Sequence, residues 1–223
     1  MSSFWESSES VERFAAREPD LRLAELIRDY RDPSATKVLD LGCAAGRNAV
    51  LLAQSGFDVE AVDSSAAMVA RTRERLASIL GRAEAERRVR VGRMDDLSWA
   101  SDADFEIVVA LGIYHCAESR AEWDRSLSES ERVLAPGGRL LVSVFTPETD
   151  LTGGGIRAVA GEPHVYDGFD SGRSFLVDAM ELDLEMARHG LRPFKPTSTA
   201  RPKVQVGRRV SANGFYIKAA AAR

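Results

Sequence analysis

The pattern of apolar and polar positions changes period along this chain and predicts an alternation of strands and helices. Short, nearly continuous apolar runs end at Leu41, Val62 and Leu111, as is typical of strands covered on both faces. Stretches with an apolar residue every three or four positions follow them and predict helices. The predicted strands are 37–41, 57–62, 89–91, 105–111 and 139–145, and the helices between them are 47–55, 64–80 and 119–134. This alternation predicts an α/β fold, a doubly wound and mostly parallel sheet with helices on both faces.

The chain departs from this alternation in three places. Residues 2–17 are polar with a few large side chains, and Pro19 then opens a helical pattern. The charged stretch 81–88 is expected to be solvated. Residues 146–172 show no clear periodicity, and a loop of this length is usually functional or disordered. Beyond it, the pattern predicts a helix over 175–190 and strands over 191–198 and 210–219.

These patterns predict one domain with additions. We expect an N-terminal helical cap or lid over 1–36 and a ligand-binding core over 37–145. An insertion that covers the substrate is expected over 146–175, and 176–223 is expected to complete the same domain with a helix and a strand pair. The length of 223 residues suits this organisation.

Composition narrows the classes of function. With 34 acidic and 30 basic residues the formal net charge is −4, which argues against a nucleic-acid substrate. The two cysteines cannot form a disulfide framework, and three histidines without a C-x-x-C pair predict no metal site. Neither a signal peptide nor a membrane-spanning run is visible, so we expect a cytoplasmic protein without membrane partners. It is expected to be a monomer or a homodimer.

The first predicted strand leads into a turn that suits a ligand. Asp40 stands at the strand end, and Gly42 and Gly46 surround small residues that let a ligand approach the backbone closely. The first amides of the following helix have no partner inside that helix and favour a negative group. The Asp40 carboxylate can accept hydrogen bonds from an ammonium. The turn therefore fits a ligand that carries both an ammonium and a carboxylate.

The run from Lys37 to Asn48 resembles motif I of the class I S-adenosylmethionine (SAM) dependent methyltransferases. The second strand closes on Asp63, where that family places the acid that binds both ribose hydroxyls, and a carboxylate can accept both hydrogen bonds. Residues 134–142, which include a Pro-Gly-Gly sequence, resemble the family's loop and fifth strand. The resemblance spans 37–145 in order. It implies the Rossmann-like class I methyltransferase fold with a C-terminal antiparallel hairpin, SAM as cofactor and S-adenosylhomocysteine as product.

The resemblance also implies a set of cofactor contacts, and Gly46-Arg47-Asn48 is similar to a run in the tellurite-resistance-like branch of the family. Arg47 or Asn48 either reaches the SAM carboxylate or only caps the helix. Arg93 departs from the family pattern, which places an acid here for the adenine amino group; Asp95 either substitutes for it or forms a polar turn. The expected cofactor-binding residues are Asp40, Gly42, Cys43, Ala44, Gly46, Arg47, Asn48, Asp63, Ser64, Met68, Met94, Asp95, Leu111 and Gly112.

His115 and Tyr114 are the candidate general bases, because they follow the fourth strand and ligands of such sheets bind beyond the carboxyl ends of the strands. The alternative role of His115 is packing or a hydrogen bond to the backbone. Aromatic side chains are the candidates for a substrate cover, with packing on the flank of the sheet as the alternative. These candidates are Phe4, Trp5, Tyr30, Tyr166 and Phe169.

We therefore expect a SAM-dependent methyltransferase that moves the sulfonium methyl group to a nitrogen, oxygen, sulfur or similar nucleophile of a small molecule by in-line displacement. One alternative is a non-catalytic module that binds SAM or a nucleoside. A weaker alternative is a nicotinamide-dependent oxidoreductase, whose turn requires the pattern G-x-G-x-x-G. Here Ala44 occupies the third position and Arg47 the sixth.

Overall fold

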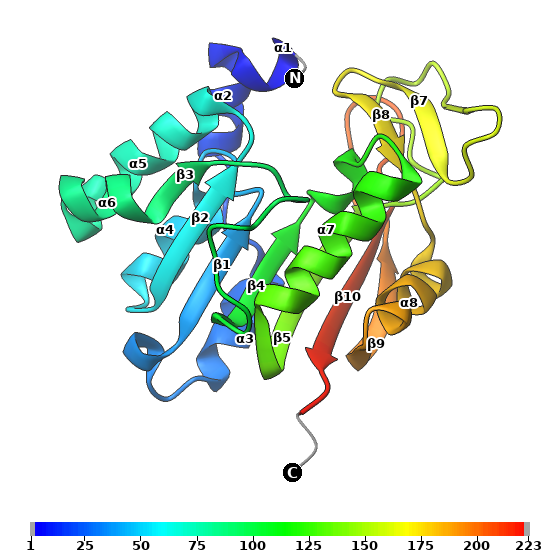
Figure 1. The fold of residues 1–223 in the computed structure, drawn as a ribbon. Coiled ribbons are helices and arrows are strands. Elements are labelled where there is room, and N and C mark those ends of the chain that lie inside the picture. The colour runs from blue at the N-terminus through cyan, green and yellow to red at the C-terminus, as the bar shows by residue number, and fades with distance from the viewer. Residues whose placement is uncertain (1–2, 221–223) are drawn as a thin grey trace.

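A single seven-stranded sheet dominates the computed structural model, which describes residues 3–220 (Figure 1). The strand order is β3-β2-β1-β4-β5-β10-β9. Strands β1 to β5 pair in parallel, whereas β10 is antiparallel to both β5 and β9. The predicted doubly wound sheet with a C-terminal antiparallel hairpin is therefore confirmed. The strands are β1 (Lys37–Leu41), β2 (Asp58–Asp63), β3 (Val89–Val91), β4 (Phe105–Leu111), β5 (Leu134–Phe145), β9 (Leu191–Ala200) and β10 (Ser211–Lys218).

Helices cover both faces of this sheet because the buried strands are apolar on both sides. Val38 and Leu39, neighbours on β1, belong to two different apolar clusters, as successive side chains of a strand must. One cluster contains residues of α3 (Leu21–Leu26), α4 (Arg47–Gln54), α5 (Ala66–Leu80) and α6 (Arg82–Arg88). The other contains residues of α7 (Arg120–Val133) and α8 (Ala179–Arg188). Within residues 3–220 no helix combines the length and apolarity needed to cross a membrane.

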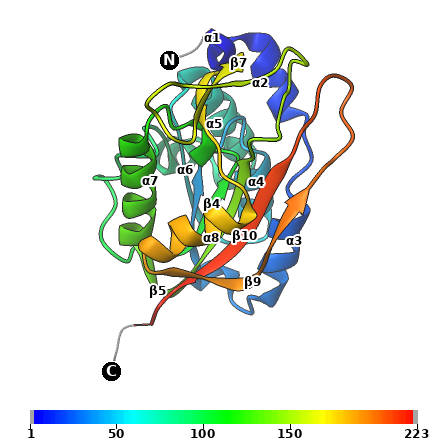
Figure 2. The same ribbon diagram turned by 90° about the vertical axis from the view of Figure 1, so that its right-hand side faces the viewer.

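The two additions lie at the carboxyl ends of the parallel strands, as both views show (Figures 1 and 2). The N-terminal addition consists of α1 (Ser3–Glu6) and α2 (Ser8–Ala15). The insertion after β5 forms a small antiparallel sheet of β6 (Arg157–Ala158), β7 (Val165–Phe169) and β8 (Gly172–Phe175). Both additions therefore lie at the end of the sheet where ligands of this architecture bind.

Three local predictions are corrected. The stretch 81–88 is not merely solvated, because α6 forms there and Arg88 binds Glu84 at 2.9 Å. Residues 146–172 are not a structureless loop, and β8 occupies the beginning of the helix expected over 175–190. Helix α5 begins after Ser65, not Ser64, because the Ser65 hydroxyl accepts the Met68 amide at 3.2 Å.

Candidate functional site

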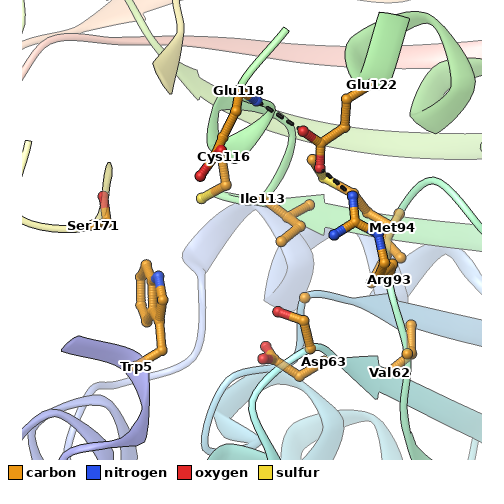
Figure 3. A pocket seen from close by; sticks show the side chains of 14 residues that line it. Trp5, Val62, Asp63, Arg93, Met94, Ile113, Cys116, Glu118, Glu122 and Ser171 are labelled. Carbon is orange, nitrogen blue, oxygen red and sulfur yellow. Dashed lines mark hydrogen bonds and ion pairs between the residues drawn. The ribbon is translucent and has the colours of Figure 1, made fainter. Parts of the chain in front are cut away.

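A cavity of about 340 Å³ opens where the turn after β1 meets the ends of β2, β3 and β4. Figure 3 shows Trp5 from α1 on one side, Arg93 and Met94 on the other, and Asp63 between them. Five predicted residues line it: Trp5, Gly42, Asp63, Ser64 and Met94. The remaining lining residues are Leu41, Val62, Gly92, Arg93, Ile113, Cys116, Glu118, Glu122 and Ser171.

The turn after β1 requires glycine at two positions. Gly42 has φ +73°, and an added Cβ would lie 2.6 Å from the Ile113 Cβ. Gly46 has φ +80°, and an added Cβ there would lie 2.9 Å from the Thr72 side chain. The amides of Gly42 and Cys43 both donate to the Val62 carbonyl oxygen, at 2.9 and 3.0 Å, so the turn is fixed against the end of β2. A ligand can therefore contact backbone here that any larger side chain would cover.

The Asp63 carboxylate is held in a fixed orientation at the end of β2. Its Oδ1 accepts the Ser65 amide at 2.9 Å, and its Oδ2 accepts the Ala44 amide at 2.8 Å. Ala44 adopts φ +46° in making this contact, an uncommon conformation for a residue with a side chain. Burial raises the pKa of Asp63, while these amide hydrogen bonds oppose the rise. The result is an oriented acceptor on the cavity wall.

Asp40 is buried, with 2% of its surface exposed, and its Oδ2 has no hydrogen-bond partner among the described residues. Burial raises the pKa of this carboxyl to about 7, and the positive charge of Arg47 partly offsets the rise. The Ala49 amide also binds this carboxylate and lowers its pKa, but the unpartnered oxygen is costly when ionised, since it has lost its hydration. A cation such as an ammonium would supply the missing partner.

Arg47 and Asn48 connect the N-terminal segment to α4. The Arg47 guanidinium donates to the Glu18 carbonyl oxygen at 2.9 Å, and the Asn48 Oδ1 accepts the Asp20 amide at 3.1 Å. Asn48 therefore acts as an anchor for the segment before α3. Arg47 carries a positive charge close enough to Asp40 to lower the pKa of that carboxyl.

On the side of β3, the expectation for Asp95 is corrected. Its carboxylate pairs with Arg93 and Arg125, each at 2.8 Å, and it does not line the cavity beside the glycine turn. Arg93 also pairs with Glu122 at 2.7 Å, so its guanidinium is held between two carboxylates at the cavity wall. Glu122 further accepts the Glu118 amide at 2.9 Å (Figure 3).

Sequence reasoning missed Glu118 and Glu122 at the cavity. The available signal was Ser119 followed by Glu122 at the start of a helix, a spacing that marks a helix N-terminus. That signal predicts where α7 begins, but not that this end faces the turn after β1.

The two candidate bases differ sharply. Tyr114 is fully buried, and its hydroxyl donates to the Ser130 Oγ at 2.7 Å, so the expectation that it serves as a base is corrected. Burial raises the pKa of this hydroxyl well above its usual range. His115 is 7% exposed, stacks on Phe145 at 4.0 Å, and its Nδ1 has no partner among residues 3–220. Burial, followed by the charge of Arg209, lowers the pKa of His115 to about 3, so the imidazole is neutral.

The other predicted cofactor-binding residues lie either in the apolar core or at the end of β4. Met68 is fully buried in a small apolar cluster and does not line the cavity, and Cys43 is buried beside Thr72. Leu111 packs against the helix-covered cluster of α3 to α6, whereas Gly112 has φ +95° and donates its amide to the Ser143 carbonyl oxygen.

The aromatic residues predicted to cover the substrate lie in different parts of the structure. Phe4 makes an edge contact with Trp5, at 4.8 Å between ring centroids. Phe169 lies over Phe145 at 6.3 Å, and Tyr166 pairs in the small sheet. Tyr30 is corrected, because it contacts Phe57 just before β2, at the amino ends of the strands and away from the cavity.

Residues 38–138 match the protein family described as a methyltransferase domain. The comparison with curated proteins returns no match for this sequence. The predicted methyltransferase domain is therefore confirmed over residues 38–138, and the strand order is the one expected for the class I methyltransferase fold. The similarity to the tellurite-resistance-like branch stays a prediction.

Solved structures share this fold over most of the chain. A protein of Pyrococcus horikoshii is 23% identical, with a TM-score of 0.62, and the match covers 96% of this chain and 93% of that one. The 1,6-didemethyltoxoflavin N1-methyltransferase of Burkholderia thailandensis, solved with its substrate and S-adenosylhomocysteine, is 21% identical, with a TM-score of 0.65 and coverages of 95% and 80%. The cyclase SpnF is 15% identical, with a TM-score of 0.65 and coverages of 90% and 81%. At such identities the likeness concerns the fold, which hosts more than one reaction.

Proposed function

We propose that this protein transfers the sulfonium methyl group of SAM to a nitrogen, oxygen or sulfur nucleophile of a small molecule. The observation that carries this proposal is the pair of carboxylates on either side of one glycine turn. Asp63 is oriented into the cavity, and Asp40 is buried with one carboxylate oxygen unpartnered among the described residues. A ribose diol fits the first and an ammonium fits the second. Tight turns with no ligand do not need such a pair.

The residues that would hold the cofactor follow from this placement. Asp63 would accept the two ribose hydroxyls, and Asp40 would accept the ammonium. The backbone at Gly42, Ala44 and Gly46 would lie against the ligand, and Trp5 would cover it from α1. Met94 on the wall opposite Trp5, together with Ser64 next to Asp63, lines the space left for the base.

When bound, SAM supplies a methyl group that is already activated by its sulfonium. The new bond from the nucleophile to the methyl carbon forms as the carbon–sulfur bond breaks, and the nucleophile's proton leaves to solvent or to a nearby base. The contribution of the protein is to hold the acceptor in line and to exclude water. His115, a neutral imidazole just beyond Gly112, is placed to orient the acceptor rather than to take up a full proton.

A small acceptor is supported by the additions around the cavity. Trp5 from α1 and Ser171 from the insertion both line it, so the chain itself encloses the site. The net charge of −4 gives no broad attraction for a nucleic acid. By its name, the Burkholderia relative methylates a small heterocycle.

Calorimetric titration with SAM and with S-adenosylhomocysteine tests the cofactor, and transfer of a labelled methyl group to small amines, phenols, thiols and acids tests the reaction. We expect one site that binds both ligands with a dissociation constant on the order of micromolar. An Asp63→Asn variant is the matched control, since it keeps the shape but removes the charged acceptor. No binding to the wild-type protein would overturn the proposal.

One observation favours a second candidate, a module that binds SAM without transferring a methyl group. Arg93 stands where the family places an acid, and it is fixed by Asp95 and Glu122. Tight binding of SAM without labelled product from any acceptor class would support that role. The nicotinamide alternative has no such support, because Ala44 and Arg47 replace the second and third glycines of its turn and the domain match is to methyltransferases.

A further inference from the structure

Beyond Gly112, an aromatic wall is assembled from separate parts of the chain. His115 stacks on Phe145 at 4.0 Å with an angle of 28° between the rings. Phe169, from β7 of the insertion, lies nearly parallel to Phe145 at 6.3 Å and 11°. Phe145 and Phe169 are both half-buried residues. The wall therefore offers flat apolar surface next to the end of β4.

Arg209, in the segment between β9 and β10, adds a positive charge to this wall. Its guanidinium carbon lies 5.5 Å from the centre of the Phe145 ring. Among residues 3–220 no carboxylate forms an ion pair with Arg209. Burial lowers the pKa of Arg209, and the nearby charges of Arg47 and Arg22 lower it further.

The surroundings of Arg209 do not neutralise it. Asp20, whose charge acts on Arg209, is already paired with Arg22 at 2.7 Å. Arg17, whose guanidinium carbon lies 4.0 Å from the Phe14 ring centre, is a further cation close enough to be repelled by Arg209. A half-buried guanidinium among other cations is unfavourable without an anion. This point of the site therefore has a deficit of negative charge.

A buried polar atom in the same wall also lacks a partner. His115 is 93% buried, and its Nδ1 makes no hydrogen bond within the described part of the chain. The neutral ring can donate or accept one hydrogen bond. A ligand with a polar ring substituent would satisfy that atom.

Building on the proposed function, we infer that the methyl acceptor is a planar ring that carries a negatively charged group. The ring packs on Phe145 and Phe169, and Arg209 binds the charged group. Arg209 thereby selects the acceptor, whereas Asp40 and Asp63 hold the cofactor. Two anions are candidates for the group that Arg209 binds: the acid of the acceptor and the carboxylate of SAM. The experiment distinguishes between them.

The test measures binding of matched acids and amides to protein saturated with S-adenosylhomocysteine. The probes are 4-hydroxybenzoate against 4-hydroxybenzamide and quinoline-2-carboxylate against its carboxamide. We expect at least one acid to bind about tenfold more tightly than its amide, because a charged pair in a half-buried site contributes about 1.4 kcal/mol or more. Arg209→Gln should remove this preference and leave affinity for S-adenosylhomocysteine within about twofold.

Arg201→Gln is the matched control, since Arg201 lies in the same segment, is exposed and pairs with Glu148 at 2.8 Å. It should keep the preference. Arg209→Lys keeps the positive charge but not the planar guanidinium. It replaces the glutamine variant if that variant does not fold, and binding of S-adenosylhomocysteine tests the folding of each variant. The lysine variant should retain only part of the preference for the acid.

Three outcomes overturn the inference. The first is that the wild-type protein binds neither acid more tightly than its amide, which includes the case in which it binds none of the probes. Another is a preference that survives in Arg209→Gln. The third is a loss of S-adenosylhomocysteine affinity, but not of 5′-methylthioadenosine affinity, in Arg209→Gln, which would assign Arg209 to the carboxylate of the cofactor. By contrast, a wild-type protein that binds no S-adenosylhomocysteine overturns the proposed function itself.

Discussion

At the scale of single residues, the site depends on carboxylates whose ionisation is costly without a ligand. Asp40 is the extreme case, because it is buried and one of its oxygens is unpartnered. Asp63 is better supported, since two backbone amides hold it. The two residues therefore predict different responses to pH and to substitution.

Asp40→Asn should make the ligand-free protein more stable relative to wild type as the pH rises. The folded-state pKa of Asp40 is raised to about 7, so this group contributes stability that is full below the unfolded pKa and is lost as pH rises through about 7. Thermal unfolding between about pH 5 and pH 8 should show a growing advantage of the variant. With saturating SAM, the wild-type protein should instead be the more stable of the two. A difference in stability that does not change with pH, both with and without SAM, would contradict this assignment.

Asp63→Asn should weaken S-adenosylhomocysteine binding by about 1.5–3 kcal/mol, because the ribose hydroxyls lose a charged acceptor. Calorimetry gives the affinity directly. A dissociation constant equal to that of the wild type would remove Asp63 from the ribose site.

His115→Ala should lower turnover by about tenfold to a hundredfold while affinity for S-adenosylhomocysteine is kept. Since the pKa of His115 is about 3, titration of this imidazole should not change the rate of methyl transfer by the wild-type protein near neutral pH. The measurement is the pH profile of methyl transfer. His189→Ala, a half-buried histidine beside Ser128 on the α7–α8 side, is the control and should leave turnover unchanged.

At the scale of elements, α1 is fastened beside the cavity by the start of α5. The Glu6 carboxylate accepts the amides of Ala66 and Ala67 at 3.1 and 3.2 Å, and the Ser65 hydroxyl donates to the Trp5 carbonyl oxygen at 3.1 Å. A carboxylate at a helix N-terminus is favourable because the first amides there are free. The same contact places Trp5 over the site.

Glu6→Ala should therefore speed the release of S-adenosylhomocysteine by about threefold to tenfold, as expected from the loss of a helix cap. Dissociation rates from rapid mixing test this. Glu9→Ala, on the neighbouring helix α2, is the matched control. Equal release rates in all three proteins would show that α1 does not retain the ligand.

The insertion is likewise fixed to the core at its end. Phe175, the last residue of β8, stacks on Trp123 of α7 at 4.5 Å and 20°, and both side chains are fully buried. Val165 at the start of β7 is also fully buried. The small sheet is therefore a rigid wall that carries Phe169, rather than a free loop.

At the scale of the whole molecule, the proposed cofactor site joins the N-terminal segment, the core and the insertion, so binding should stabilise all of them together. S-adenosylhomocysteine at about one hundred times its dissociation constant should add about 2.7 kcal/mol to the unfolding free energy. For a chain of this size that corresponds to a rise in melting temperature of roughly 5–10 °C. Thermal scans with and without ligand check this, and Asp63→Asn at the same ligand concentration should shift less.

The sequence by itself determined the alternation of strands and helices, the place of the glycine turn and the two acids at strand ends. These are local properties, since period, turn chemistry and strand ends depend on neighbours in the chain. They predict the order β1 to β5 and the cofactor side of the site. They also predict Asp40, Gly42 and Asp63 as its centre.

Only the tertiary structure decided which distant side chains meet that centre. Tyr114 and His115 are adjacent in sequence, yet one is bonded to Ser130 in the core and the other joins Phe145 beside the site. Asp95 is taken up by Arg93 and Arg125, and Tyr30 lies at the far end of the sheet. Arg209 reaches the aromatic wall because β10 runs antiparallel to β5, which brings the start of β10 beside Phe145. Such contacts follow from packing between remote segments, which no local pattern in the chain specifies.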